Sequence, residues 1–304
     1  MIEVLHAGLC DLVMDQGRAG LGALGVPAGG AADPKALAAA NCLVGNDPGT
    51  AGLEITLSGP TLRFPAGGVV ALTGAPFKAM RGSGGAVGWN ETLVLGEGET
   101  LSLERAETGC RCWLAVQGGL AVPSIMHSRS TFPPAGFGGY RGRPLKAGDV
   151  LNGGVTTHDV HLKRARNPAS DPKDAPLRVI AGPQASQFDD KGLAAFFSGE
   201  YQVGPASDRR GLRLTGPMVS HSCIDLPSQG VLPGTIQVPP DGLPIILGWD
   251  GPVTGGYPVI AGVISADWPR LAQLRPGAML RFVTIEHAVA RARAPAEWII
   301  EALA

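Results

Sequence analysis

The sequence predicts a mainly β protein, and three observations support this class. Apolar residues make up 44% of the 304 residues and charged residues only 17%, so a packed core is available and little disorder is expected. The 45 glycines and 26 prolines separate short runs rich in Val, Ile, Leu and Thr, which is typical of many strands joined by tight turns. At this length a chain also tends to fold as two domains rather than around one core.

Individual elements follow from local pattern. Apolar runs predict strands at 59–64, 68–74, 86–95, 100–106, 110–120 and 176–182, and the two runs within 236–261 predict a β-hairpin. The clearest helix begins after Asp33 as N-cap, has Pro34 at its first position and ends before Gly45. Further short helices are expected near 184–198 and 267–274.

The domain organisation is expected to comprise four segments. An N-terminal β subdomain spans 1–160, and the charged, proline-rich segment 161–176 is interpreted as a linker or an exposed crossing. A C-terminal β-barrel spans 177–287, and a terminal helix spans 288–304. The two halves share short similar strings, such as Leu57–Pro60 and Leu214–Pro217. Whether the chain is a duplicated barrel stays an open question at this point.

Charge and composition exclude some partners. The chain has 25 basic and 26 acidic residues and no basic tract, so neither nucleic acid nor an anionic membrane is expected as a partner. Because it shows no signal peptide and no long apolar run, a soluble, cytoplasmic protein is expected. The five scattered cysteines are interpreted as small buried apolar residues. His158 and His161 are interpreted as loop residues, and no metal site is expected.

Common catalytic motifs are missing from the sequence. There is no G-x-x-x-x-G-K-[ST] phosphate loop, no G-x-G-x-x-G that leads from a strand into a helix, and no G-x-S-x-G. His127 adjoins Ser128, but neighbours on a strand point to opposite sides, so it is poorly placed to activate that hydroxyl.

Polar residues instead gather in four glycine-rich clusters, at 14–33, 41–60, 207–217 and 236–261. Glycine lets backbone N–H groups approach a ligand, and arginine grips a carboxylate or phosphate with a planar fork. For each cluster the alternative, a turn held by a surface ion pair, stays open.

Six ordered blocks make the chain similar to the biotin-dependent carboxyltransferase family, over roughly residues 3–287. The blocks read MDQGRAGLGALGVPAGGAADPKALAAANCLVGN, LEITLSGP, WLAVQGGLAVPSIMHSRST, GGYRGRPLKAGDVL, SDRRGLRLTG and IQVPPDGLPIILGWDGPVTGGYP. This family includes the C component of the bacterial ATP-dependent 5-oxoprolinase, the second component of allophanate hydrolase, half of the carboxyltransferase region of urea carboxylase, and the antagonist of a sporulation-kinase inhibitor.

The resemblance implies two cyclophilin-like open β-barrel subdomains and an obligate partner. In 5-oxoprolinase the B component, a smaller cyclophilin-like barrel protein, would supply the other half of the site, and the A component would complete hydrolysis. ATP would phosphorylate the amide oxygen of 5-oxoproline so that water can attack, which gives glutamate. An isolated chain is then expected to be inactive. Whether this chain itself contacts ATP stays open.

The same resemblance implies a set of site residues. Asp250, Gln237 and Asp241 are expected to be catalytic. Residues expected to bind the amide substrate or an anion are Arg18, Asp33, Asn41, Glu54, Ser128, Arg129, Asp208, Arg209, Thr254, Gly255, Gly256 and Tyr257.

Two other functions remain open at this point. The chain could be one part of a carboxyltransferase that acts on urea or another amide, with carboxybiotin supplied by another chain. It could instead be a non-catalytic regulator that binds a kinase-inhibitor partner. The sequence departs from the usual family residues at Met14, Gln16, Gly29, His127 and Pro252–Val253, so a shifted substrate or a weakly active paralogue also stays open.

Overall fold

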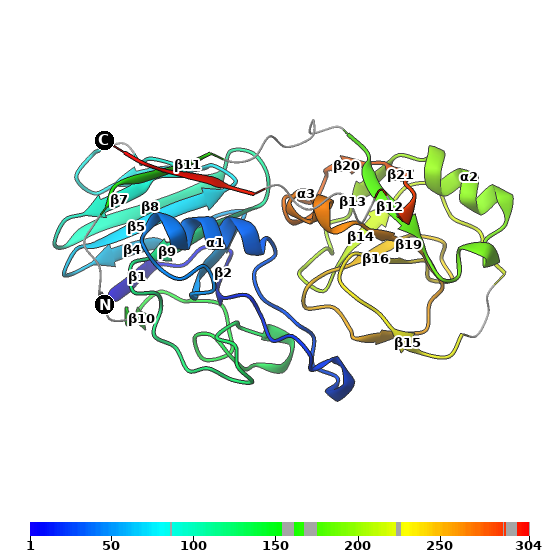
Figure 1. The fold of residues 1–304 in the computed structure, drawn as a ribbon, viewed down its shortest axis with the longest axis horizontal. Coiled ribbons are helices and arrows are strands. Elements are labelled where there is room, and N and C mark those ends of the chain that lie inside the picture. The colour runs from blue at the N-terminus through cyan, green and yellow to red at the C-terminus, as the bar shows by residue number, and fades with distance from the viewer. Residues whose placement is uncertain are drawn as a thin grey trace. The chain divides into compact units, whose positions relative to one another are not determined.

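The chain folds as two units, which the computed structural model shows in Figure 1. The structure describes residues 1–85, 87–153, 161–166, 175–222, 226–287, 289 and 297–303. Unit 1 contains Met1–Arg18, Gly29–Pro168 and Glu297–Ala304. Unit 2 contains Ala19–Ala28 and Ala169–Ala296. Residues 19–28 thus belong to unit 2, although the sequence on both sides of them forms unit 1. Residues 297–304 belong to unit 1, although the sequence before them forms unit 2.

Unit 1 is built from two antiparallel five-stranded sheets. One sheet has the order β10-β1-β4-β8-β6, with β10 at Val150–Leu151, β1 at Ile2–His6, β4 at Thr61–Phe64, β8 at Glu99–Ala106 and β6 at Phe77–Arg81. The other has the order β2-β3-β9-β5-β7, with β2 at Cys10–Met14, β3 at Gly52–Thr56, β9 at Arg111–Val116, β5 at Gly68–Gly74 and β7 at Thr92–Leu95. Both sheets contribute to one apolar core.

Strands β5 and β9 are buried on both faces, which explains their continuous apolar runs. Val70 and Leu72 point into the core between the sheets. Val69 and Ala71 point the other way and pack against α1 (Pro34–Leu43). The helix begins as predicted, because the Asp33 carboxylate accepts the N–H groups of Lys35 and Ala36.

The C-terminal residues correct two expectations. Residues 163–166, expected to lie in a linker, form β11 (Lys163–Arg166), and this strand pairs antiparallel with β22 (Ile299–Ala302). The tail is therefore a strand where a helix was expected. Trp298 and Ile300 alternate with exposed residues and pack against the apolar cluster formed by α1, β5 and their neighbours. This tertiary burial overrides the helix propensity of a segment that contains Ala and Glu. Residues 167–174 and 290–296 lie outside the described part.

Unit 2 contains an eight-stranded sheet of order β20-β13-β14-β17-β16-β19-β12-β21. Its two edge strands, β20 and β21, are joined by Arg281 alone, so the two edges come together and the sheet is a nearly closed barrel. The mainly β class and the barrel type are as predicted. The strands are β12 at Leu177–Ala181, β13 at Tyr201–Val203, β14 at Gly211–Thr215, β16 at Thr235–Gln237, β17 at Ile245–Leu247, β19 at Val259–Val263, β20 at Met279–Leu280 and β21 at Phe282–Thr284.

Smaller elements complete unit 2. The predicted hairpin is formed by β16 and β17, with Ile236 opposite Ile246. Strand β15 (Gln229–Gly230) pairs with β18 (Thr254–Gly255). Helices α2 (Asp190–Ser198) and α3 (Trp268–Ala272) lie where short helices were predicted. Within the described residues, none of the helices has the length and apolar character needed to cross a bilayer.

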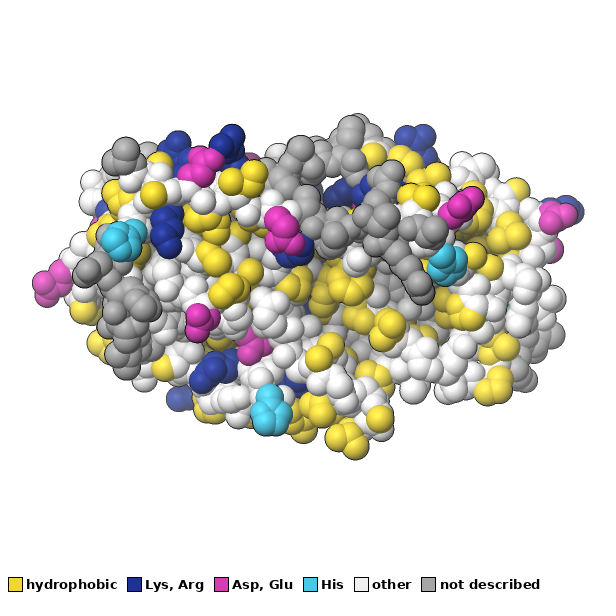
Figure 2. Space-filling view, in the orientation of Figure 1, with side chains coloured by type: hydrophobic (Ala, Val, Ile, Leu, Met, Phe, Trp, Pro, Cys, Tyr) yellow, Lys and Arg dark blue, Asp and Glu magenta, His cyan; other side chains and the backbone are white. Residues whose placement is uncertain are grey.

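The face shown in Figure 2 carries basic and acidic side chains interspersed among neutral ones. This arrangement agrees with the balanced composition of 25 basic and 26 acidic residues.

The core of unit 1 contains a carboxyl group, Asp11 of β2, that generates a prediction. Its side chain accepts the Gly8 N–H at 2.6 Å, while Oδ1 has no hydrogen-bond partner in the described part of the chain. Burial raises the pKa of Asp11 to about 7. Because this exceeds the unfolded value of about 4, the native state binds the proton more tightly, and that stabilisation is lost as the pH rises through 7.

We therefore expect Asp11→Asn to remove part of the decline in unfolding free energy between about pH 4 and pH 8, by at most about 4 kcal/mol. Urea unfolding at a series of pH values measures this slope. The exposed Asp208→Asn variant is the control and should keep the wild-type slope. An Asp11→Asn slope equal to that of wild type would contradict the prediction.

Candidate functional site

The first polar cluster, in unit 1, is organised by the buried carboxylate of Asp15. Its Oδ1 accepts the hydroxyls of Ser128 and Ser130, both at 2.6 Å, and the Gly17 N–H at 2.8 Å. Its Oδ2 accepts the Arg129 N–H at 2.5 Å. These hydrogen bonds offset the cost of burying the charge and fix the 128–130 segment against the end of β2.

Arg18, predicted to bind an anion, is buried in contacts within unit 1. Its side chain is 2% exposed, and Nη2 donates to the Ser130 carbonyl at 2.5 Å. Its guanidinium lies 5.0 Å from the centre of the Phe137 ring. Arg18 therefore ties the 128–130 segment to the loop that carries Phe137. The predicted Arg129 is exposed, and its Nε donates to the Val122 carbonyl at 3.1 Å.

That loop, residues 136–142, can approach the 128–131 segment because of its glycines. Gly138 has a φ of 73°, and a Cβ there would lie 2.1 Å from the Ser130 carbonyl oxygen. A Cβ on Gly139 would lie 1.9 Å from the Thr131 hydroxyl. Any larger residue would separate the two segments.

Three predicted residues of unit 1 have positioning roles. Asp33 caps α1, and burial raises its pKa to about 6. Asn41 donates to the Thr50 carbonyl at 2.7 Å and accepts from Asn46 at 3.0 Å. Glu54 is fully buried in β3, where Oε2 accepts the Ala32 N–H at 2.7 Å and the Trp113 indole N–H at 3.2 Å.

The second cluster, in unit 2, surrounds the end of the β16–β17 hairpin. Gln237 is 4% exposed, and its Nε2 donates to the Tyr257 carbonyl at 3.2 Å. A Cβ on Gly255 would lie 2.6 Å from that nitrogen, so glycine is needed for the close approach. Gly256 is half-buried, whereas Thr254 and Tyr257 are exposed.

Asp250 and Arg209 form a bidentate ion pair in the same unit. Arg209 Nε lies 2.7 Å from Oδ2, and Nη2 lies 3.1 Å from Oδ1. The side chains are 8% and 1% exposed, for the arginine and the aspartate respectively. The backbone N–H of Asp250 also donates to the Arg209 carbonyl at 3.0 Å. The pair thus fixes the loop after β17 against the segment before β14.

The other predicted acidic residues of unit 2 lie at the surface. Asp208 accepts the Arg210 N–H at 2.8 Å and pairs with its side chain at 2.9 Å. Asp241 accepts the Leu243 N–H at 3.0 Å, as in an Asx turn. No cluster of three or more His, Cys, Asp or Glu side chains suited to a metal ion occurs within the described ranges.

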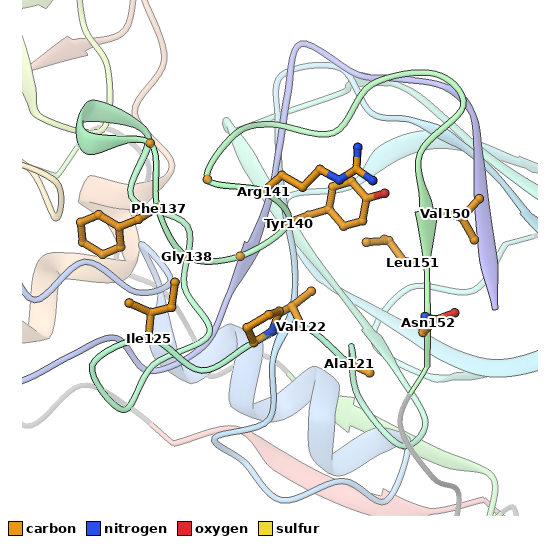
Figure 3. Close-up of a pocket in the computed structure, with 14 residues that line it drawn as sticks. Ala121, Val122, Ile125, Phe137, Gly138, Tyr140, Arg141, Val150, Leu151 and Asn152 are labelled. Carbon is orange, nitrogen blue, oxygen red and sulfur yellow. The ribbon is translucent and has the colours of Figure 1, made fainter.

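Sequence reasoning missed a hollow in unit 1 beside the Asp15 cluster. Its volume is about 490 Å³, and Figure 3 shows the side chains around it. It is lined by Ala121, Val122, Pro123, Ile125, Gly136, Phe137, Gly138, Gly139, Tyr140, Arg141, Gly142, Val150, Leu151 and Asn152. The block GGYRGRPLKAGDVL covers part of this region, but none of its residues is among the predicted site residues.

The buried Arg209–Asp250 pair and the neighbouring exposed Asp208–Arg210 pair allow a direct comparison of how burial changes the contribution of an ion pair to stability. We expect Asp250→Ala to lower the unfolding free energy by about 3–5 kcal/mol, because it leaves Arg209 as a buried charge without its counterion. Asp208→Ala should cost less than about 1 kcal/mol, because its pair is solvated. Urea unfolding measures both variants. Equal losses for the two aspartates would refute the structural role given to the buried pair.

Comparison with known proteins agrees with the resemblance seen in the sequence. A family model described as "Carboxyltransferase domain, subdomain A and B" matches residues 24–284. The chain is 39% identical over 285 residues to the C component of 5-oxoprolinase from Escherichia coli (strain K12), and the match covers 93% of this chain and 91% of that protein.

Larger proteins contain the same region. The chain is 32% identical over 311 residues to the urea amidolyase of Saccharomyces cerevisiae, covering 95% of this chain but 17% of that protein. The crystal structure of the Kluyveromyces lactis urea amidolyase superposes with a TM-score of 0.87 at 32% identity, over 95% of this chain and 19% of that chain. The chain therefore belongs to the family of carboxyltransferase domains composed of subdomains A and B.

Proposed function

We propose that this protein is the C component of an ATP-dependent 5-oxoprolinase, which acts with the B and A components to hydrolyse 5-oxoproline to glutamate. The observation that carries the proposal is the 39% identity to the C component of the Escherichia coli 5-oxoprolinase, because the matched region covers 93% of this chain and 91% of the relative. A likeness of that extent covers more than nine-tenths of both chains.

The chemistry around Gln237 supports an amide substrate. A lactam offers one N–H donor and one carbonyl acceptor, and a glutamine side chain offers the complementary groups. Gln237 Nε2 is engaged by the Tyr257 carbonyl, whereas Oε1 accepts no hydrogen bond from the described residues. In the proposal, Oε1 accepts the lactam N–H, and the exposed hydroxyls of Thr254 and Tyr257 orient the ring.

ATP is assigned to the assembled complex rather than to this chain. Arg18 and Arg209 were among the residues expected to bind an anion. Their guanidinium groups are instead engaged by the Ser130 carbonyl and the Asp250 carboxylate, and neither presents an open phosphate cradle. Within the described residues, these two arginines therefore do not by themselves form a phosphate site. Its proposed contribution is to bind and orient the amide.

One observation favours a second candidate function. The urea amidolyase of Kluyveromyces lactis shares the fold with a TM-score of 0.87, although this chain covers only 19% of it. A carboxyltransferase component that acts on urea or another amide would need biotin from another chain, because the sequence has no Met-Lys-Met string.

Co-expression with the products of neighbouring genes, followed by purification of the complex, separates these functions. We expect ATP-dependent release of glutamate from 5-oxoproline that avidin does not inhibit. Avidin-sensitive fixation of bicarbonate would replace the proposal with the carboxyltransferase function. A stable complex that is inactive in both assays would favour a regulatory partner.

Within an active complex, Gln237→Met tests the assigned amide contact. The substitution keeps the side-chain length but removes both polar groups, so kcat/KM for 5-oxoproline should fall about tenfold or more. Gln202→Met on the exposed face of β13 is the control and should leave kcat/KM unchanged. Unaltered turnover by the Gln237→Met variant, with a normal unfolding midpoint, would remove Gln237 from the site.

A further inference from the structure

The hollow beside loop 136–142 has the size of a small-molecule site. Its volume is about 490 Å³, within the range of roughly 300–1,000 Å³ typical of ligand pockets. It lies entirely within unit 1 and contains none of the residues predicted for the amide site. A ligand in this hollow would therefore contact a different set of residues from the proposed amide substrate.

Most of the lining is apolar. Figure 3 shows Ile125 and Phe137 toward one side of the hollow, Val150 and Leu151 toward the other, and Val122 between them. Ile125 and Val150 are 37% and 40% exposed, so the apolar surface can be reached from solvent. Such walls favour a ligand with a planar or branched apolar body, because binding removes apolar area from water.

The charge at the hollow comes from Arg141. Two guanidinium groups lie over the Tyr140 ring, those of Arg141 at 5.3 Å and of Arg143 at 5.5 Å from its centre. Arg143 is neutralised by Asp149 through two hydrogen bonds of 2.7 and 2.8 Å. Arg141 is exposed and forms no hydrogen bond or ion pair with the residues that the structure describes, although the Asp149 carboxylate also attracts it electrostatically. Of the residues that line the hollow, it is the one with a charged side chain.

The backbone also restricts where Arg141 can lie. Its φ is 56°, a left-handed conformation that is uncommon for a residue other than glycine. The Gly142 N–H donates to the Gly138 carbonyl at 2.8 Å, which closes a turn around Arg141. In Figure 3 the guanidinium and the Tyr140 hydroxyl lie at the same end of the hollow. The cation is therefore presented on a defined turn rather than on a flexible tip.

We propose that this hollow binds a small monoanion, of the carboxylate class, whose apolar body lies between the Val122 and Val150 sides and whose anionic group meets Arg141. The single cation of the lining matches one negative charge, whereas a phosphate dianion would need further cationic donors. The Asn152 amide has no side-chain hydrogen bond within the described residues and adds a neutral donor.

A pair of fluorescent probes tests this proposal on the full chain. Anilinonaphthalene sulfonate has an aromatic body with one negative charge, and phenylnaphthylamine has a similar body without it. We expect saturable binding of the anionic probe. Arg141→Gln should weaken the anionic probe about tenfold, as expected for the loss of a charge-assisted hydrogen bond, but leave the neutral probe within about twofold. Arg141→Lys, which keeps the charge, should retain more affinity than Arg141→Gln.

Matched controls separate the hollow from other surfaces. Arg105→Gln removes an exposed arginine elsewhere on unit 1 and should change neither probe. Val150→Trp should fill the hollow and weaken both probes, whereas Val94→Trp, at another exposed strand position, should weaken neither. A cooperative unfolding transition for each variant confirms folding.

Three results with the fluorescent probes would overturn the proposal. They are no saturable binding to the unaltered chain, equal effects of Arg141→Gln on the two probes, or undiminished binding by the Val150→Trp variant. The indole acetate anion, compared with uncharged indole ethanol as competitors of the anionic probe, extends the test to a carboxylate. Only the acetate should compete effectively, and equal competition would contradict the charge assignment.

Discussion

The cost of burying charge governs how this molecule is built. A buried ion must find its partner inside the chain, and in unit 2 Arg209 and Asp250 satisfy each other through two hydrogen bonds. In unit 1 the Asp15 carboxylate is satisfied by hydroxyls and N–H groups of the 128–130 segment. These interactions hold together loops that are far apart in the sequence. The geometry of both polar clusters depends on them.

Because buried charges need partners within the chain, the residues that position the loops differ from the residues that can bind a ligand. Asp250 was expected to be catalytic, and its buried pair with Arg209 indicates that replacing it with alanine also lowers stability. Of the residues proposed to meet a ligand, Thr254 and Tyr257 in unit 2 and Arg141 in unit 1 are exposed, whereas Gln237 is largely buried. A fall in activity is thus informative about chemistry only where stability is measured as well.

Much of the fold could be predicted from local sequence, because strand periodicity, turn residues and the Asp33–Pro34 helix start act over a few positions. The tail could not, because its strand conformation depends on pairing with β11 and on packing of Trp298 and Ile300. Which of the predicted site residues bind the substrate stays a prediction. Sequence identifies polar residue types, but burial decides that Glu54 and Asn41 contact their own chain. Arg141 and Arg143 look alike in the sequence, but in the structure only Arg143 forms an ion pair with Asp149 among the described residues.

The separate roles of the exposed hydroxyls and the buried charges can be measured in the kinetics of a Thr254→Val/Tyr257→Phe variant, in the purified complex with its partner proteins. If exposed hydroxyls orient the amide while buried charges hold the loops, KM for 5-oxoproline should rise about tenfold or more, with the unfolding midpoint unchanged. Wild-type KM and kcat in that variant would contradict the claim that the exposed hydroxyls bind the substrate while the buried charged residues position the loops.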